Sequence, residues 1–150
     1  MPSDQDVLFD GFSEAQKRDF LALASSRRYT PPAVVLREGE MGSEMLLVED
    51  GQLSIWVRDA KINEVEAGSI LGISSLIEPH QRTASLRAET PASVLVFTRP
   101  KVLEYLSRAT PKLFQLFFAN AFRIHLNLID QCEDRIVKLS QELGPSLPVS

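Results

Sequence analysis

The sequence predicts a mainly β domain with helices at both ends, and two observations support this fold class. Between residues 28 and 98, short β-rich segments alternate with turn signals and no long helical pattern intervenes. That spacing is typical of an all-β sandwich or barrel. Helical periodicity is confined to the segments before Pro31 and after Thr98. At 150 residues the chain is long enough to bury one core, so a single domain is expected.

The first helix is expected just before the β region. Ser13 can cap it, and Gln16 three residues later completes a capping-box pattern. The helix should reach about Ser25, after which Pro31-Pro32 favours an extended or turn path.

The β region contains six candidate strands that are separated by turn residues. A hairpin is expected at Asp50-Gly51, because Asp-Gly between apolar runs is a strong turn signal. A second turn is expected at 58–60. The candidate strands cover residues 34–37, 45–48, 53–57, 61–65, 83–90 and 93–98.

Two helices are expected after the β region, over about 100–143. Pro100 suits the first turn of a short helix that reaches Leu106, and Pro111 begins a long helix that runs to about Leu143. Gly144-Pro145 should end it, which leaves residues 144–150 as a disordered tail or linker beyond a domain of residues 1–143.

The long helix is predicted to serve as a dimer helix. Some 30 residues at ~1.5 Å each exceed what a barrel of this size can cover. Its first half, near Phe117, Phe118 and Phe122, should pack on the barrel, and its second half on another copy of itself. The apolar stripe assigned to this homodimer contains Ile124, Leu128, Cys132 and Leu139.

Composition excludes several classes of function. A net charge of −4 and a pI near 5.2 argue against a general nucleic-acid binder, and no apolar run approaches the ~20 residues of a membrane span. The polar, acidic N-terminus is unlike a signal peptide, and one cysteine excludes an intrachain disulfide, so a cytoplasmic setting fits. Because nucleophile–base pairs, metal-ligand spacings and Walker-type loops are missing, neither catalysis nor a metal site is expected.

The segment 68–88, GSILGISSLIEPHQRTASLRA, is a candidate anion site. Gly72 opens a short helical turn, and Arg82-Thr83 follows ten residues later. Backbone N–H groups in turns and at helix starts attract anions, and arginine adds a forked, permanently charged donor. The alternative is that Arg82 pairs with a carboxylate such as Glu78 or Glu89, or faces solvent.

The order of elements resembles that of the cyclic-nucleotide-binding domain: a helix, a β region with glycines at its turns, then a short and a long helix. Glu38-Gly39, Gly51, Gly68 and Gly72 fall where this family keeps turn glycines, and Arg82-Thr83-Ala84-Ser85 is similar to the end of its phosphate-binding cassette. The resemblance implies a β-roll (jelly roll) and a cyclic nucleotide ligand, cAMP or cGMP, or a cyclic dinucleotide. The residues it assigns to the phosphate are Gly72, Ile73, Ser74, Arg82 and Thr83.

Two departures from the family pattern weaken this expectation. The family usually has a glutamate that holds the ribose 2′-hydroxyl where this chain has Ile73. A hydrogen bond to a charged group is worth up to ~3 kcal/mol, so its loss corresponds to about a hundredfold in affinity. The transcription factors of the family also continue into a helix-turn-helix, whereas this sequence stops at Ser150, so no DNA reading is expected within it.

Other polar residues are weaker candidates. Asn127 lies near the place where relatives contact the base across the dimer, with a helix-surface role as the alternative, and a haem role for His80 is not favoured. The expected function is a non-enzymatic regulatory sensor. The rivals are a ligand-free scaffold that binds a protein partner, and the sensor half of a larger transcription regulator.

Overall fold

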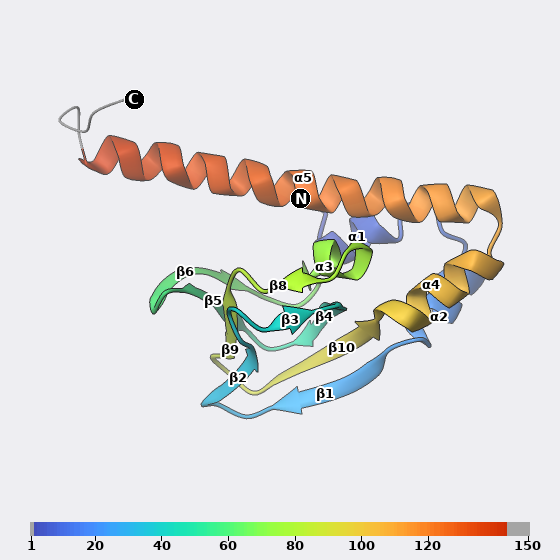
Figure 1. Cartoon of the computed structure of the whole chain (residues 1–150), viewed down its shortest axis with the longest axis horizontal. Coiled ribbons are helices and arrows are strands. Elements are labelled where there is room, and N and C mark those ends of the chain that lie inside the picture. Colours follow the sequence, from blue (N-terminus) through green and yellow to red (C-terminus); the bar gives the residue numbers. More distant parts are fainter. Residues whose placement is uncertain (1, 144–150) are drawn as a thin grey trace.

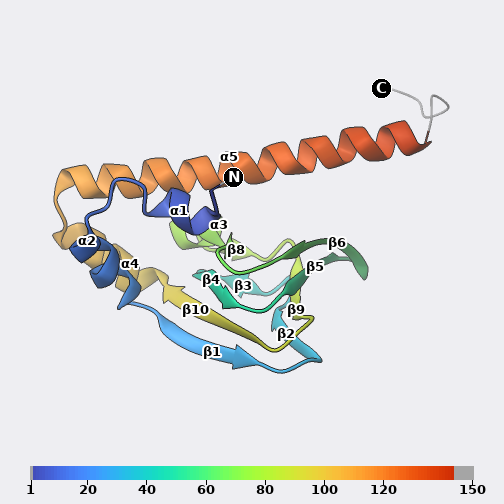
Figure 2. The same cartoon turned by 180° about the vertical axis from the view of Figure 1, so that it is seen from behind.

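The structure, a computed structural model, describes residues 2–143, apart from the side chains of Cys132, Arg135, Ile136 and Leu143. The sheets form a roll, and a long C-terminal helix lies across it with two short helices in between (Figures 1 and 2). This arrangement confirms the predicted fold class of a β-roll with flanking helices.

The helices are α1 (Asp4–Leu8), α2 (Glu14–Leu21), α3 (Ile73–Ile77), α4 (Arg99–Arg108) and α5 (Pro111–Leu143). The strands are β1 (Ser25–Tyr29), β2 (Ala33–Leu36), β3 (Met41–Gly42), β4 (Glu44–Asp50), β5 (Leu53–Val57), β6 (Ala60–Val65), β7 (Ile70–Leu71), β8 (His80–Gln81), β9 (Ser85–Ala88) and β10 (Ala92–Thr98).

The strands pair in an antiparallel manner throughout. One four-stranded sheet has the order β1-β10-β4-β7 and faces a second with the order β2-β9-β5-β6, while β3 and β8 form a separate short ladder. In that ladder Gly42 lies opposite His80 and Met41 opposite Gln81, which joins the candidate anion segment to a part of the chain some 40 residues earlier.

Strand β4 is buried on both faces, which explains its uninterrupted apolar run. Leu46 and Val48 point between the two sheets, and Met45 and Leu47 point toward the helices. Strands buried on both faces lose the usual alternation of polar and apolar residues. The apolar cluster on the helix side is called the helix-facing core below; it includes Phe20, Phe97, Phe117, Val102, Leu106, Ile73, Leu76 and Ala121.

Several local predictions are confirmed. Ser13 and Gln16 form the expected capping box at α2, with Ser13 Oγ accepting from the Gln16 N–H at 3.1 Å. The turn at 58–60 joins β5 to β6. The short and long C-terminal helices lie where they were expected, and residues 144–150 lie outside the described residues.

Two local predictions are wrong. Asp50-Gly51 does not close a hairpin: β4 pairs with β10 and β7, whereas β5 pairs with β6 and β9, so the chain crosses between sheets at Gly51. A Cβ at Gly51 would lie 2.4 Å from the Pro91 carbonyl oxygen, which requires glycine at this crossing. The helix that was expected to reach about Ser25 is α2, which ends at Leu21, because Ser25 already belongs to β1. A further helix, α1, precedes α2 and was not predicted.

The predicted assignment of the faces of α5 also needs correction. Phe117 is buried as expected, but Phe122 is 60% exposed and does not pack on the barrel. Ile124, assigned to the dimer stripe, is 4% exposed and belongs to the helix-facing core. The helix carries two apolar stripes, and the one containing Ile124 covers the chain's own body.

Candidate functional site

A cavity of about 670 Å³ opens between the sheet β2-β9-β5-β6 and the middle of α5. Its walls are largely aliphatic, and its polar groups come from α3, from β8 and the residues that follow it, from β6 and from α5. The aliphatic lining residues are Leu36, Ile55, Val57, Ile62, Leu71, Leu86 and Leu128. A neighbouring cavity of about 710 Å³ shares Gly72, Ser74, His80, Thr83 and Leu128 and continues toward α1.

Arg82 supplies the positive charge of the cavity. It is 9% exposed, its Nη1 donates to Ser75 Oγ at 2.7 Å, and its Nη2 donates to the Glu44 carbonyl oxygen at 3.1 Å. Burial lowers the pKa of Arg82, and the nearby Glu44 charge partly opposes that shift. Two of its five N–H donors are thereby used, both on neutral acceptors.

Among the described residues, no carboxylate lies within ion-pair distance of Arg82. The Glu44 carboxylate pairs instead with Arg27 at 3.7 Å, and Glu89 lies 3.7 Å from Lys61. Arg82 pairs with neither Glu78 nor Glu89 and does not face solvent, so the alternative interpretation of the sequence is wrong. A buried charge without a counter-ion is costly, and such a charge is usually paired in proteins.

Two glycines make room for the Arg82 side chain. A Cβ at Gly42 would lie 2.0 Å from Arg82 Nε, and one at Gly72 would lie 2.7 Å from Nη1. Gly72 also has a φ of +77°, a backbone conformation that favours glycine, whereas Gly42 does not have a positive φ. Gly42 is thus glycine because the guanidinium lies against its backbone. Sequence reasoning missed this residue, since no local turn signal marks it.

The two basic residues around Gln81 fold back onto consecutive serines of α3. Ser75 Oγ accepts from Arg82 and donates to the Gly72 carbonyl oxygen at 2.9 Å. Ser74 Oγ lies 3.0 Å from His80 Nε2, and His80 Nδ1 lies 2.8 Å from the Gln81 carbonyl oxygen. These serines join α3 to the segment of β8.

The remaining candidate residues differ in their positions. Thr83 is exposed at the mouth of both cavities, so the structure brings it together with Gly72, Ser74 and Arg82. Ile73 is 6% exposed, belongs to the helix-facing core and lines only the neighbouring cavity.

The middle of α5 contributes residues to the cavity that the sequence did not suggest. Leu128, Gln131 and Asp134 line it, whereas Asn127 is exposed and belongs to neither cavity wall within one chain. The base contact of Asn127 across a dimer stays a prediction. Leu139 is half-exposed, and the side chain of Cys132 lies outside the described part of the structure.

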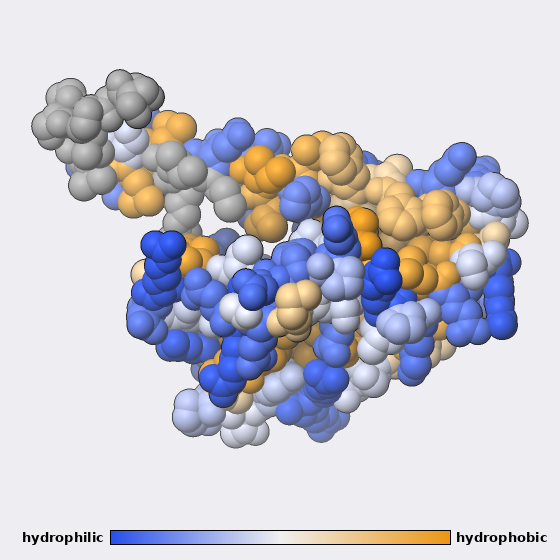
Figure 3. All heavy atoms as spheres, in the orientation of Figure 1, coloured by the Kyte–Doolittle hydropathy of each residue, from blue (hydrophilic) through white to orange (hydrophobic). Residues whose placement is uncertain are grey.

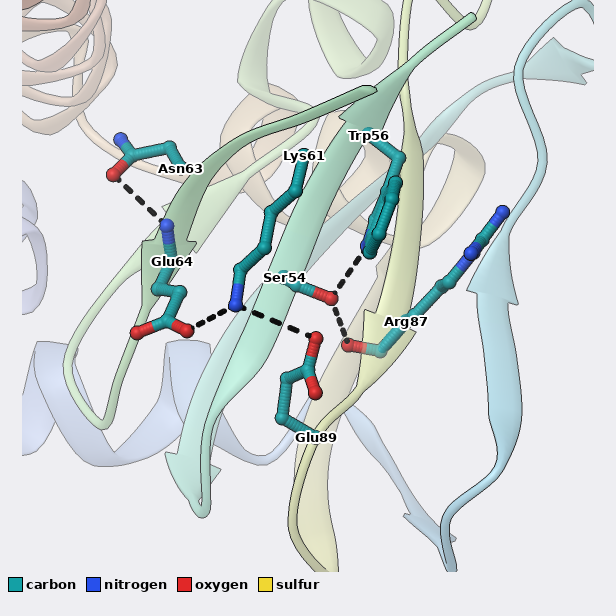
Figure 4. A network of polar contacts seen from close by, with 7 residues as sticks. All are labelled: Ser54, Trp56, Lys61, Asn63, Glu64, Arg87 and Glu89. Carbon is teal, nitrogen blue, oxygen red and sulfur yellow. Dashed lines mark hydrogen bonds and ion pairs between the residues drawn. The ribbon is translucent and has the colours of Figure 1, made fainter. Parts of the chain in front are cut away.

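A polar network fixes β6, whose Ile62 and Asn63 stand at the cavity mouth (Figure 4). Lys61 bridges Glu64 on β6 and Glu89 beyond β9. On the same outer face, Arg87 lies over the Trp56 ring at 4.3 Å, and Trp56 Nε1 donates to Ser54 Oγ at 2.7 Å. Because Ser54 and Trp56 point outward, Ile55 and Val57 of the same strand are left to line the cavity.

The described residues form neither a metal-type cluster nor a membrane-spanning helix. No three His, Cys, Asp or Glu side chains gather there as a metal site would require. None of the described helices is long and apolar enough to cross a membrane.

Comparison with known families identifies this arrangement. Residues 26–109, which run from β1 through α4 and include Arg82, match the sequence profile described as "Cyclic nucleotide-binding domain". The chain belongs to the cyclic nucleotide-binding domain family. The match stops just before α5, so the family assignment rests on the roll and the cavity segment.

Curated proteins with similar sequences contain this domain as a small part. The chain is 23% identical over 116 residues to a cGMP-dependent protein kinase of Plasmodium berghei (strain Anka), covering 77% of this chain and 14% of the kinase. It is 37% identical over 62 residues to the human potassium/sodium hyperpolarization-activated cyclic nucleotide-gated channel 3, covering 41% of this chain and 8% of the channel. The chain therefore spans less than a sixth of the length of these two relatives.

Solved structures confirm the fold. A cyclic nucleotide-binding domain from Methylobacillus flagellatus KT superimposes with a TM-score of 0.81 at 22% identity, over 95% of this chain and 84% of that one. The catabolite activator protein of Thermus thermophilus gives a TM-score of 0.76 at 19% identity, over 89% of this chain and 62% of that one.

Proposed function

We propose that this domain is a non-enzymatic regulatory sensor that binds a cyclic nucleotide, or a related phosphate ligand, through Arg82. The observation that carries the proposal is a buried guanidinium that lines a cavity and contacts only neutral acceptors. An anionic ligand would supply the missing negative charge, and a forked arginine suits phosphate oxygens.

The lining of the cavity limits what the rest of the ligand can be. Aliphatic side chains from both sheets and α5 form most of the wall, and such walls suit the flat body of a nucleoside. A cyclic phosphodiester brings one negative charge to the one arginine of this wall. With Ile73 in place of a ribose-binding carboxylate, affinity about a hundredfold below that of a complete site is expected.

Contacts with α5 offer a route from ligand to output. Leu128, Gln131 and Asp134 line the same cavity as Arg82, so a ligand would touch the helix and the roll together. A ligand shifts an equilibrium only by its differential contacts with two states. The position of α5 over the cavity is the two-state element that this sensor would use.

The partner we propose for α5 is a second copy of the same helix. Apolar patches lie along the visible face of α5 (Figure 3). The exposed stripe on the face turned away from Ile124 consists of Phe122, Leu126, Ile129 and Val137. Steps of four, three and eight residues keep these side chains on one face, which fits a helix of the same pattern, and a two-fold axis lets each stripe cover the equivalent stripe of the other copy.

The dimer is tested by sedimentation of the Phe122→Glu variant. Placing a charge in the stripe should convert a dimer to a monomer without unfolding it, since Phe122 is 60% exposed within one chain. Asn127→Glu is the matched control, because Asn127 follows Phe122 by five residues and therefore lies about 140° away from it around the helix axis. A monomeric wild-type chain, or equal behaviour of both variants, would contradict this partner.

Ligand binding is tested by calorimetric titration with cAMP and cGMP. Micromolar to millimolar binding is expected, and it should be lost in Arg82→Ala and strongly weakened in Arg82→Lys, which keeps the charge but loses the fork. Circular dichroism would confirm that the variants stay folded. No heat up to millimolar ligand from folded wild-type protein would reject a cyclic nucleotide and favour the scaffold role.

A further inference from the structure

His80 lines the same cavity as Arg82, two residues before it in the chain. Both residues line the cavity, and they are separated by one residue of extended backbone, so their side chains leave the same side of the segment. We propose that His80 strengthens anion binding at this site through its charge and through Ser74 Oγ, and takes up a proton as an anion binds. The inference rests on the proposed function in placing that anion at Arg82.

The hydrogen bonds of His80 assign its neutral form. Nδ1 lies 2.8 Å from the Gln81 carbonyl oxygen, which can only accept, so Nδ1 carries the hydrogen. Nε2 is then the acceptor, and at 3.0 Å it receives the hydrogen of Ser74 Oγ. In this state the one hydrogen of Ser74 is directed at His80, and its oxygen lone pairs are what a ligand would meet.

Protonation reverses the bond between Ser74 and His80 without moving a heavy atom. A proton from solvent adds to Nε2, which becomes a donor to Ser74 Oγ, while Nδ1 keeps its bond to the Gln81 carbonyl oxygen. The Ser74 hydrogen is released and can be donated into the cavity. The site thereby gains one positive charge and one hydroxyl donor from a single proton.

The surrounding charges make this protonation depend on the ligand. Arg82 carries the like charge nearest in sequence, and in the empty cavity it opposes a second positive charge on His80. An anion on Arg82 removes that opposition and attracts the imidazolium. The other titratable groups that line the two cavities with His80 are Asp4 on α1, Glu64 on β6, Glu66 after it, and His125 and Asp134 on α5. In addition, Glu44 of β4 lies near Arg82, and Glu78 precedes His80 by two residues.

None of these acidic groups forms an ion pair or a hydrogen bond with His80. Glu64 is engaged with Lys61, and the Glu44 carboxylate with Arg27. Neither carboxylate is hydrogen-bonded to His80, because His80 Nε2 is paired with Ser74 Oγ and His80 Nδ1 with the Gln81 carbonyl oxygen. The charge of the ligand is therefore the variable one, which couples proton uptake to binding.

The first test uses sulfate, whose charge is constant between about pH 5 and pH 8, the range in which histidine changes charge. The histidine ring resonances are followed by NMR against pH with and without saturating sulfate. The chain has two histidines, so His80→Gln assigns the signals and His125 serves as an internal control. The titration midpoint of His80 should rise by about one pH unit with sulfate, and should not rise in Arg82→Met. An unchanged midpoint in the wild-type chain overturns the inference.

The second test measures cAMP affinity at about pH 5.5 and pH 8, on either side of histidine titration. The phosphodiester keeps its charge over this range, so a change in affinity with pH must come from titration of the protein. We expect binding about tenfold tighter at the lower pH. The gain should vanish in His80→Gln, persist in His125→Gln, and be reduced in Ser74→Ala, which keeps the imidazolium but loses the hydroxyl.

The outcomes separate the two proposals. Binding of cAMP through Arg82 with equal affinity at both pH values keeps the sensor function and overturns the role of His80. Absence of cAMP binding together with a sulfate-dependent His80 midpoint rejects the nucleotide and keeps the proton-coupled anion site.

Discussion

The helix-facing core and the cavity are both buried, but they treat polar atoms in opposite ways. In the core, both N–H groups of the buried Asn120 amide are used: Nδ2 donates to the Leu8 and Asp10 carbonyl oxygens, each at 2.9 Å. In the cavity, a charged guanidinium rests on neutral acceptors and keeps most of its donors unused. The core is arranged for stability, whereas the cavity accepts an electrostatic cost that a ligand can relieve.

The two regions also differ in packing. Phe20 has no exposed surface, and its ring lies 5.1 Å from Phe97 and 5.4 Å from Phe117 between centroids. The cavity instead leaves about 670 Å³ open beside Arg82. Substitutions in the core should therefore change stability and not affinity, and substitutions around Arg82 should do the reverse.

The largest effect is expected in the core, for Phe20→Ala. Removing a fully buried ring leaves a void between α2, β10 and α5, and such changes cost about 3–5 kcal/mol. Urea unfolding measures the loss, and ligand affinity of the protein that remains folded should stay at the wild-type value. A loss below about 1 kcal/mol would mean that this cluster is not the tightly packed region described above.

The next largest effect is expected for Arg82→Met, in which an uncharged side chain occupies much of the space of the arginine. Because no carboxylate is left behind unpaired, the free energy of unfolding should be unchanged or rise by about 1–2 kcal/mol, while binding is lost. Arg99→Met is the matched control: Arg99 Nε donates to the Leu76 carbonyl oxygen at 3.1 Å at the end of α3. That substitution should lower stability by about 1 kcal/mol. If Arg82→Met destabilises the protein more than Arg99→Met, Arg82 has a structural role.

Much of the fold could be predicted because its signals are local. The capping box at Ser13, the turn at 58–60 and the long helix from Pro111 all follow from neighbouring residues. The failures came where partners are distant. Asp50-Gly51 signals a change of direction but does not specify which strand is paired next, and the actual partners of β5 lie later in the chain.

The same limit explains what was found of the site. The spacing from Gly72 to Arg82 singled out two residues that line the same cavity, since both lie in one stretch of sequence; that this segment binds an anion stays a prediction. Gly42 could not be identified, because its contact with Arg82 exists only once β3 pairs with β8. Likewise, helical period reveals apolar stripes on α5 but not which stripe faces the body, so Ile124 was assigned to the wrong face.

A smaller effect is expected for Gly42→Ala, which adds one carbon atom beside Arg82. It tests whether a change at the cavity lowers affinity and leaves stability nearly unchanged. The new Cβ would fall 2.0 Å from Arg82 Nε, so the flexible arginine must move, and affinity should drop about tenfold with little loss of stability. Gly39→Ala is the reverse control: φ is +88° there and nothing lies within 4 Å, so it should cost about 1 kcal/mol of stability without affecting binding. Equal changes in both variants would mean that Gly42 serves the backbone and not Arg82.

The smallest effect is expected at Asp4 of α1, which lines the neighbouring cavity. Its Oδ2 accepts from the Ile70 N–H at 3.0 Å, yet burial raises the pKa of Asp4 above 3.8. Since the folded state resists ionisation, the contribution of Asp4 to stability is greatest below pH 3.8 and declines as pH rises through the folded pKa. Asp4→Asn keeps an acceptor oxygen but cannot ionise, so urea unfolding should show the variant gaining on wild type from acid to neutral pH. The opposite trend would mean that the charge stabilises the first turn of α1 more than its burial opposes it.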